Sequence, residues 1–218
     1  RLSDFSADLA HELRTPIHTL RMQTEVSLGK PRSIDEYRDL LASSLEEYER
    51  LSRIIGDMLF LAKAEHGLVS PGTETIALRS LCQRLVEYYG ILAENVGLEL
   101  RGDEVGIPGD RLMLERAIGN LLVNAIRHTP SGGRIVLAIA REAERAVITV
   151  SNSGPAIPSD ALGTIFDRFV RLDQDSEGSG LGLAITRSIV DAHRGTIAVR
   201  TGEANTEFVI GLPLRVAR

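Results

Sequence analysis

Two apolar seams in the first third of the chain restrict its fold more than any other feature. Their members alternate in spacing between three and four residues, which is typical of helices that pack along one stripe. The first seam consists of Leu2, Ser6, Leu9, Leu13, Pro16 and Leu20, and the second of Tyr37, Leu41, Ser44, Tyr48, Leu51, Ile55, Met58 and Ala62. Between them, Gly29-Lys30-Pro31 combines a helix stop with a turn. The sequence therefore predicts an antiparallel helical hairpin.

The second helix of this hairpin carries its own start and stop signals. Ser33 can cap its first turn, with Glu36 three residues on as the partner in a capping box. The helix is expected to end near Gly67, and Pro71-Gly72 marks a short linker. We therefore divide the chain into a hairpin at residues 1–66, a linker at 67–74 and a second domain at 75–218.

A hairpin alone leaves apolar surface exposed. Pairing of two chains into a dimeric four-helix bundle would cover that surface. The alternative is that the hairpin packs on its own second domain. Because the seams run the whole length of both helices, the pattern favours the dimer.

The pattern after residue 73 changes to mixed helix and strand. Helices are expected at 76–97, where a short strand precedes the helix, and at 110–128 and 180–193. Strands are expected at 98–101, 134–141, 146–151, 196–200 and 207–212, the last two forming a hairpin around Gly202. Intermingled strands and helices favour one sheet with helices on one face. The predicted fold class is α+β.

Composition excludes several classes of protein. Aromatic residues make up only 4% and Trp is absent, so the core must rest on aliphatic side chains. A net charge of −5 argues against broad nucleic-acid binding, which needs clustered Lys and Arg. Cys82 is the single cysteine and is expected to be a small buried residue without a redox role. The chain shows neither a bilayer-length apolar run nor a signal peptide. It begins at Arg1, not Met, in what reads as the middle of a helix, so we interpret it as an excised fragment.

The first candidate site lies in the first helix, in the segment from Phe5 to Pro16. His11 falls two residues past a seam position, on the outward face, where an imidazole can act as a nucleophile towards phosphorus. Glu12 is adjacent and can assist by binding a ring proton. Thr15 lies four residues on, on the same face, and its hydroxyl can position a water. Spacing alone favours the plainer interpretation, a solvated histidine beside a chance proline kink.

Three further segments suggest an anion or nucleotide site. Asn120 and Asn124 share one helix face, and Asn124 can offer a neutral oxygen to a hard cation such as Mg²⁺. A strand ends at Asn152, and Gly154 allows a close approach to a ligand. The glycine-rich run from Gly178 to Gly182 opens a helix, where backbone N–H groups favour an anion. Each segment by itself is also compatible with an ordinary helix surface or loop.

In order and spacing, five segments resemble the signature boxes of sensor histidine kinases. His11-Glu-Leu-Arg-Thr-Pro16 resembles the H-box, Asn120 to Thr129 the N-box, and Asn152 to Gly154 the first glycine box. Phe166 to Phe169 resembles the F-box and Gly178 to Gly182 the second glycine box. The resemblance covers nearly the whole chain, and the wording of the boxes is most similar to the heavy-metal-sensor branch.

The resemblance implies a dimerisation and phosphotransfer hairpin followed by a GHKL-type α/β sandwich that binds ATP and Mg²⁺. It implies that His11 is the phosphoacceptor, that Glu12 is its assisting base, and that Thr15 assists dephosphorylation of a response regulator. Asn124 would bind Mg²⁺. The other residues implied at the nucleotide are Asn120, Arg127, His128, Asn152, Gly154, Ile157, Phe169, Arg171, Gly178, Ser179, Gly180, Leu181, Gly182 and Leu183. The family also implies a homodimer, a cognate response regulator, and a cytoplasmic location below an inner-membrane sensor whose membrane segments lie outside this fragment.

One position departs from the family's pattern. Asn152 stands where the family usually has Asp, so its oxygen can accept a bond from adenine only without charge assistance. Two other functions stay open on the residues alone: an ATP hydrolase of the same superfamily, and a nucleotide-binding scaffold without catalysis. The hydrolases activate water with a carboxylate on the N-box helix, whereas Glu115 lies five residues before Asn120 and does not project beside it.

Overall fold

The computed structural model describes residues 2–172 and 179–215, without the side chains of residues 2–8, 11 and 12. Two compact units make up the chain, Arg1–Ala62 and Lys63–Arg218. In the described ranges, no helix combines the length and the apolar character needed to cross a bilayer. The boundary between the units follows Ala62, whereas the sequence analysis ends the hairpin at residue 66.

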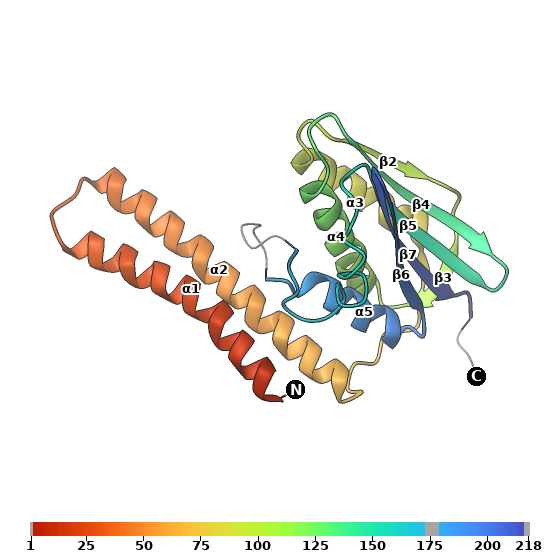
Figure 1. The fold of residues 1–218 in the computed structure, drawn as a ribbon, viewed down its shortest axis with the longest axis horizontal. Helices are drawn as coiled ribbons and strands as arrows, with labels where there is room; N and C mark the ends of the chain where they lie inside the picture. Colours follow the sequence, from red (N-terminus) through yellow and green to blue (C-terminus); the bar gives the residue numbers. More distant parts are fainter. Residues whose placement is uncertain (1, 173–178, 216–218) are drawn as a thin grey trace. The chain divides into compact units, whose positions relative to one another are not determined.

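The first unit is the predicted hairpin, formed by α1 (Leu2–Leu28) and α2 (Ile34–Glu65) (Figure 1). The capping box at the start of α2 is confirmed. The backbone N–H of Glu36 donates to Ser33 Oγ at 3.2 Å, and the backbone N–H of Ser33 donates to Glu36 Oε2 at 2.8 Å. The backbone N–H and the hydroxyl of Ser33 lower the pKa of the Glu36 carboxyl below its ordinary value, so the cap is charged at neutral pH.

The face of α1 that is buried agrees with the first seam, whereas the second seam is partly wrong. Pro16 and Leu20 are buried, and in α2 the buried residues are Ile54, Met58 and Leu61. Several residues of the predicted second seam are exposed instead, namely Tyr37, Leu41, Tyr48 and Ile55. The cause is that α2 carries two adjacent apolar stripes, and a single helix partner covers only one of them.

The second unit contains a five-stranded sheet and a small two-stranded sheet. The five-stranded sheet has the order β2-β4-β5-β7-β6, with β2 parallel to β4 and all other pairs antiparallel. Its strands are β2 (Gly97–Arg101), β4 (Arg134–Glu142), β5 (Arg145–Asn152), β6 (Thr196–Gly202) and β7 (Asn205–Pro213). The predicted strands are confirmed, and each of the five is longer than expected.

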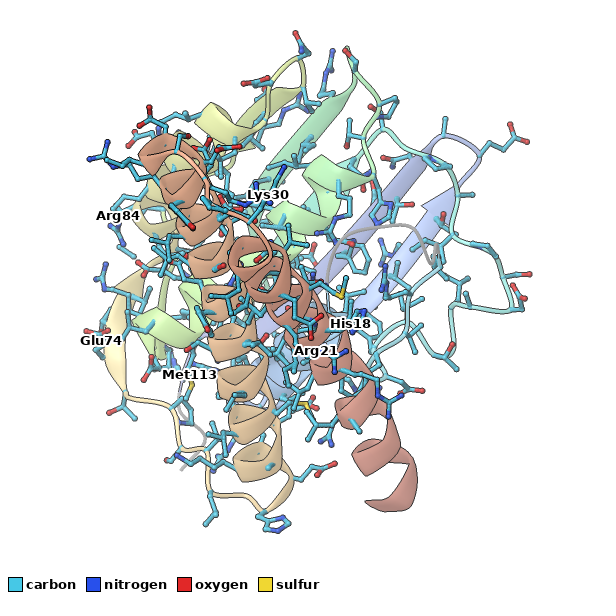
Figure 2. The ribbon with its side chains drawn as sticks, turned by 90° about the vertical axis from the view of Figure 1, so that its left-hand side faces the viewer. His18, Arg21, Lys30, Glu74, Arg84 and Met113 are labelled. Atoms are coloured by element: carbon cyan, nitrogen blue, oxygen red, sulfur yellow. The ribbon has the colours of Figure 1, made fainter. Side chains whose placement is uncertain are left out.

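Three helices lie on one face of the five-stranded sheet (Figure 1): α3 (Leu78–Leu92), α4 (Arg111–Arg127) and α5 (Gly182–Ala192). The predicted N-cap of α4 is confirmed, since Asp110 Oδ1 accepts from the backbone N–H of Met113, labelled in Figure 2, at 3.0 Å. Two boundaries were wrong. Helix α3 ends at Leu92, before Asn95 adopts a left-handed φ of 62°, and α5 begins two residues after Gly180.

The sequence analysis did not foresee β3 (Gly106–Gly109), which pairs antiparallel with β1 (Glu74–Ala77). Two glycines and a proline in four residues conceal this strand, because neither residue type favours strands. Pairing with β1 and the burial of Ile107 stabilise it nonetheless.

The core is aliphatic, as the composition predicts. Alternate residues of the central strands point to the helices and are buried, for example Ala146, Ile148 and Val150 of β5. Cys82 of α3 is fully buried, and this burial raises the pKa of its thiol to about 12. The prediction of a buried Cys82 is confirmed, and the protonated thiol is a poor nucleophile.

Candidate functional site

The first glycine box and the N-box meet at one glycine. Gly154 is buried just after β5, and a Cβ built on it would overlap the backbone carbonyl oxygen of His128, the C-cap residue of α4. Only a residue without a side chain allows the two backbones to approach so closely. The turn after Asn152 is therefore held against the C-terminal end of the helix that carries Asn120 and Asn124.

A second contact joins the N-box to the second glycine box. The side-chain amide of Asn120 donates from Nδ2 to the carbonyl oxygen of Gly182 at 3.0 Å. Thr186, fully buried in α5, lies with its Oγ1 2.9 Å from the same carbonyl and 3.3 Å from the carbonyl of Ala117. These bonds fix the first turn of α5 against the middle of α4. The backbone N–H groups of this first turn, which have no acceptor within the helix, therefore lie near Asn120.

A third contact joins the F-box to the second glycine box. The backbone N–H of Phe169 donates to the carbonyl oxygen of Gly180 at 3.0 Å. Gly180 has a φ of 66°, and a Cβ on it would lie 2.7 Å from the Phe169 backbone. Phe166 anchors the F-box by edge-to-face packing on Phe208 of the core, with ring centroids 6.2 Å apart. The two ends of the segment from Phe169 to Gly180 are thus tied together.

A pair of buried polar residues ends the core beside the first glycine box. Asn152 is the last inward-facing residue of β5 and Thr206 the first of β7; they are direct cross-strand partners, with exposed fractions of 3% and 4%. Thr206 Oγ1 lies 3.3 Å from Thr201 Oγ1, which accepts from the backbone N–H of Ile157 at 3.0 Å. The apolar interior therefore changes to an amide and two hydroxyls at this end of the sheet.

Thr201 and Thr206 were missed by the sequence analysis. Each occupies an inward position of an alternating strand where its sequence neighbours of the same face are Val199 and Phe208. The sequence did contain a signal for them, because each is a polar residue among otherwise apolar residues at the inward-facing positions of its strand. It was overlooked because Thr is itself a common strand residue.

The predicted nucleotide residues not yet placed lie around these contacts. Leu181 is buried as the N-cap residue of α5, and Ser179, Leu183, Arg171 and Asn124 are half-buried. Arg127 and His128 are exposed at the C-terminal end of α4. Gly178 lies outside the described residues.

The donor set fits a magnesium ion that arrives with a nucleotide. Asn124 supplies one neutral side-chain oxygen, and residues 2–172 and 179–215 contain no group of three or more His, Cys, Asp or Glu side chains able to hold a metal. Magnesium usually keeps several waters and phosphate oxygens among its ligands, so one amide oxygen is an adequate protein contribution.

The candidate phosphoacceptor lies within α1. His11 and Glu12 belong to this helix, but their side chains are outside the described part of the chain. Thr15 is exposed one turn further on, and Pro16 is buried. His18 and Arg21, which are also exposed, project from the same helix in Figure 2.

The position of Glu115 argues against a water-activating carboxylate beside Asn120. Glu115 pairs with Arg84 of α3 at 2.9 Å (Arg84 is labelled in Figure 2), whereas Asn120 faces α5. The two side chains therefore leave α4 on different sides, as their spacing predicts.

Comparison with known families covers both units. The family of histidine kinase-, DNA gyrase B- and HSP90-like ATPases matches residues 109–216, and the His Kinase A (phospho-acceptor) domain matches residues 1–67. The chain spans about half the length of the curated relatives it matches. It is 46% identical to the sensor histidine kinase CusS of Escherichia coli O6:H1 over 219 residues, covering 98% of this chain and 46% of CusS. It is 40% identical to the sensor protein CzcS of Cupriavidus metallidurans, covering 100% of this chain and 47% of CzcS.

The fold is also shared with a solved structure. The Acinetobacter baumannii histidine kinase AdeS superposes with a TM-score of 0.79 at 24% identity, covering 94% of this chain and 98% of that one. The expected likeness to the heavy-metal-sensor branch is confirmed by the relatives. Because the two matching domains follow one another in a single chain that is 46% identical to a sensor histidine kinase, this chain belongs to the sensor histidine kinases and holds their phospho-acceptor and ATPase domains.

Proposed function

We propose that the chain transfers the γ-phosphoryl group of ATP to His11, and that a response regulator then takes this group onto an Asp. The observation that carries the proposal is the set of three close contacts, at Gly154, Gly182 and Gly180, that brings four separate boxes to one end of the second unit. Phosphoryl transfer asks mainly for positioning and charge neutralisation, so a few well-placed groups suffice.

Each box has a proposed part in this reaction. The backbone N–H groups at the start of α5, including those of Leu181 and Gly182, would hold the phosphates, with help from Arg127, His128 and Arg171. Asn124 would hold a Mg²⁺ ion that neutralises phosphate charge. Asn152 and Gly154 would receive the base, and Glu12 would assist His11 by binding its ring proton.

The test is to incubate the protein with Mg²⁺ and ATP labelled at the γ-phosphate. Acid-labile label is expected on the wild-type chain and is expected to disappear in His11→Gln. His18→Gln is the matched control, because His18 is an exposed histidine on the same helix, and it should keep the label. Release of free phosphate without labelled protein would favour the hydrolase, and binding without turnover would favour the scaffold.

We further propose that the chain dephosphorylates its regulator with the help of Thr15. Thr15 is exposed one turn from His11, where its hydroxyl can orient a water. In Thr15→Ala, the rate of phospho-regulator hydrolysis should fall at least about tenfold while labelling of His11 persists, since a positioned water contributes chiefly through orientation.

The control for this variant is Thr24→Ala on the same helix, where the hydroxyl bonds to the carbonyl of Leu20 at 2.8 Å. This variant should keep both activities. Equal loss of labelling and hydrolysis in Thr15→Ala would contradict a specific role for Thr15.

The last part of the proposal concerns the domains of this chain and its place in the full protein. We propose that residues 1–66 form the dimerisation and phosphotransfer domain, 67–74 a linker, and 75–218 the ATP-binding domain. The full protein would be a homodimer in the inner membrane, with this part in the cytoplasm beside its cognate regulator. The length of the relatives, about twice that of this chain, supports further segments in the full protein.

A further inference from the structure

We infer that the base-binding end of this site binds the 6-oxopurine nucleotides ITP and GTP alongside ATP. The inference rests on the proposed function, because it assigns the base of the phosphoryl donor to the polar end of the core. It concerns the chemistry of three uncharged side chains there: Asn152, Thr201 and Thr206.

The first observation is a buried amide that lacks an internal partner. Asn152 is 3% exposed, yet within the part of the chain that is described its side chain makes no hydrogen bond. Its Nδ2 lies against Gly154, 2.7 Å from the place a Cβ would take. An amide without an internal partner can bond to a ligand or a water instead. The amide is therefore available to an external group.

The second observation is that the cross-strand partners of this amide carry no charge. The cross-strand partners of Asn152 are Ile135 and Thr206. Arg134 and Glu207, the charged sequence neighbours of these partners, point to the opposite face because strand residues alternate. The polar side chains at this end of the inward face are thus an amide and hydroxyls, which can both donate and accept.

An amide can pair with either purine edge. With adenine, Oδ1 accepts from the 6-amino group while Nδ2 donates to N1. With a 6-oxopurine, a half turn of the amide lets Nδ2 donate to O6 while Oδ1 accepts from N1–H. A carboxylate can only accept, so it would meet O6 with two acceptors and a negative charge. Asn152 therefore removes the discrimination that an acid would impose here.

The transfer is the same for each nucleotide. The bond between the γ-phosphorus and the β–γ bridging oxygen breaks, and a bond from that phosphorus to an imidazole nitrogen of His11 forms. The nucleoside diphosphate leaves with the bridging oxygen and the bonding electron pair, and the proton on the other ring nitrogen passes to a base.

The experiment compares ATP, ITP, GTP and CTP as competitors of trinitrophenyl-ATP on the whole chain with Mg²⁺. ITP is the decisive nucleotide, because it changes the group at C6 without adding the 2-amino group of guanine. ITP should compete within about tenfold of ATP, because the amide can pair with either purine edge after a half turn. CTP has no purine edge and should not compete. In Asn152→Asp, ATP binding should persist while the ratio of ATP to ITP affinity rises about 10- to 100-fold, the size of a hydrogen bond to a charged group.

Ser151→Ala is the matched control, since Ser151 lies one residue away on the opposite face and bonds to Asn205 at 2.9 Å. It should leave the ATP-to-ITP ratio unchanged. The inference would be overturned by a wild-type protein that binds ATP but not ITP, or by a protein that binds no nucleotide. An ATP-to-ITP affinity ratio that stays unchanged in Asn152→Asp would also overturn it. Equal binding of ATP and ITP without any label on His11 would support it while contradicting the proposed kinase activity.

Discussion

Single residues decide where the segments of the site can touch. Gly154 allows the first glycine box to lie on the end of α4, and Gly180 allows the backbone of Phe169 to approach its own. At both glycines, backbone atoms of another segment occupy the space that an alanine methyl group would need. A side chain at either position would push two segments apart, and backbone cannot yield as a flexible side chain can.

Gly154→Ala tests this at the residue scale. The added methyl group would overlap the His128 carbonyl, so the turn after Asn152 must move, and we expect ATP affinity to fall more than about tenfold, as small displacements of positioning groups often cost. Isothermal titration with a non-hydrolysable ATP analogue measures the affinity. Gly163→Ala is the control, because its Cβ would meet open space. Equal affinities in the two variants would contradict the contact.

At the scale of elements, α3 depends on a residue far from it in sequence. Its N-cap residue, Ala77, offers no side-chain bond. Instead, Glu104 accepts from the backbone N–H of Arg79 at 2.9 Å and of Ser80 at 3.2 Å. Desolvation raises the pKa of Glu104, but these bonds outweigh it, and the pKa lies below its ordinary value.

Glu104→Ala should therefore lower the free energy of unfolding of the second unit by about 1 kcal/mol near neutral pH, as loss of an N-cap does. Because the folded-state pKa is depressed, this stabilisation is present above the unfolded pKa and is lost as pH falls through the folded one. Urea unfolding curves of the wild type and variant should thus converge in acid. Glu203→Ala, at an exposed turn, should match the wild type at every pH. A difference between Glu104→Ala and the wild type that is independent of pH would contradict the charged cap.

At the scale of the whole molecule, the hairpin leaves a large apolar stripe uncovered. On α2 it comprises Leu41, Leu45, Tyr48, Ile55 and Leu59, and the exposed fraction of Leu41 is 70%. Such a stripe beside a complete intramolecular seam is typical of a four-helix bundle made by two hairpins.

Leu41→Glu should convert a dimer into a monomer in sedimentation equilibrium, because a charge would be buried in the apolar interface. The control is Leu112→Glu, which alters an equally exposed leucine of the second unit, 75% exposed, and should remain dimeric. Dimers of Leu41→Glu as stable as those of the wild type would place the dimer contact elsewhere.

Much of this protein is determined by the sequence itself. The hairpin, the Ser33–Glu36 capping box, the Asp110 cap and the alternation of β5 are local, because helix period, strand period and caps depend on residues a few positions apart. The boxes too were recognisable by their order and spacing.

Only the tertiary structure decided which of these parts meet. In the structure, only one of the two apolar stripes of α2 is buried within the hairpin. Strand β3 forms by pairing with β1, and Thr206 lies opposite Asn152. None of these has a local signal, because each depends on contacts between segments far apart in the chain. The same holds for the contacts at Gly154, Gly180 and Gly182: a glycine is visible in the sequence, but the residue that it approaches is not.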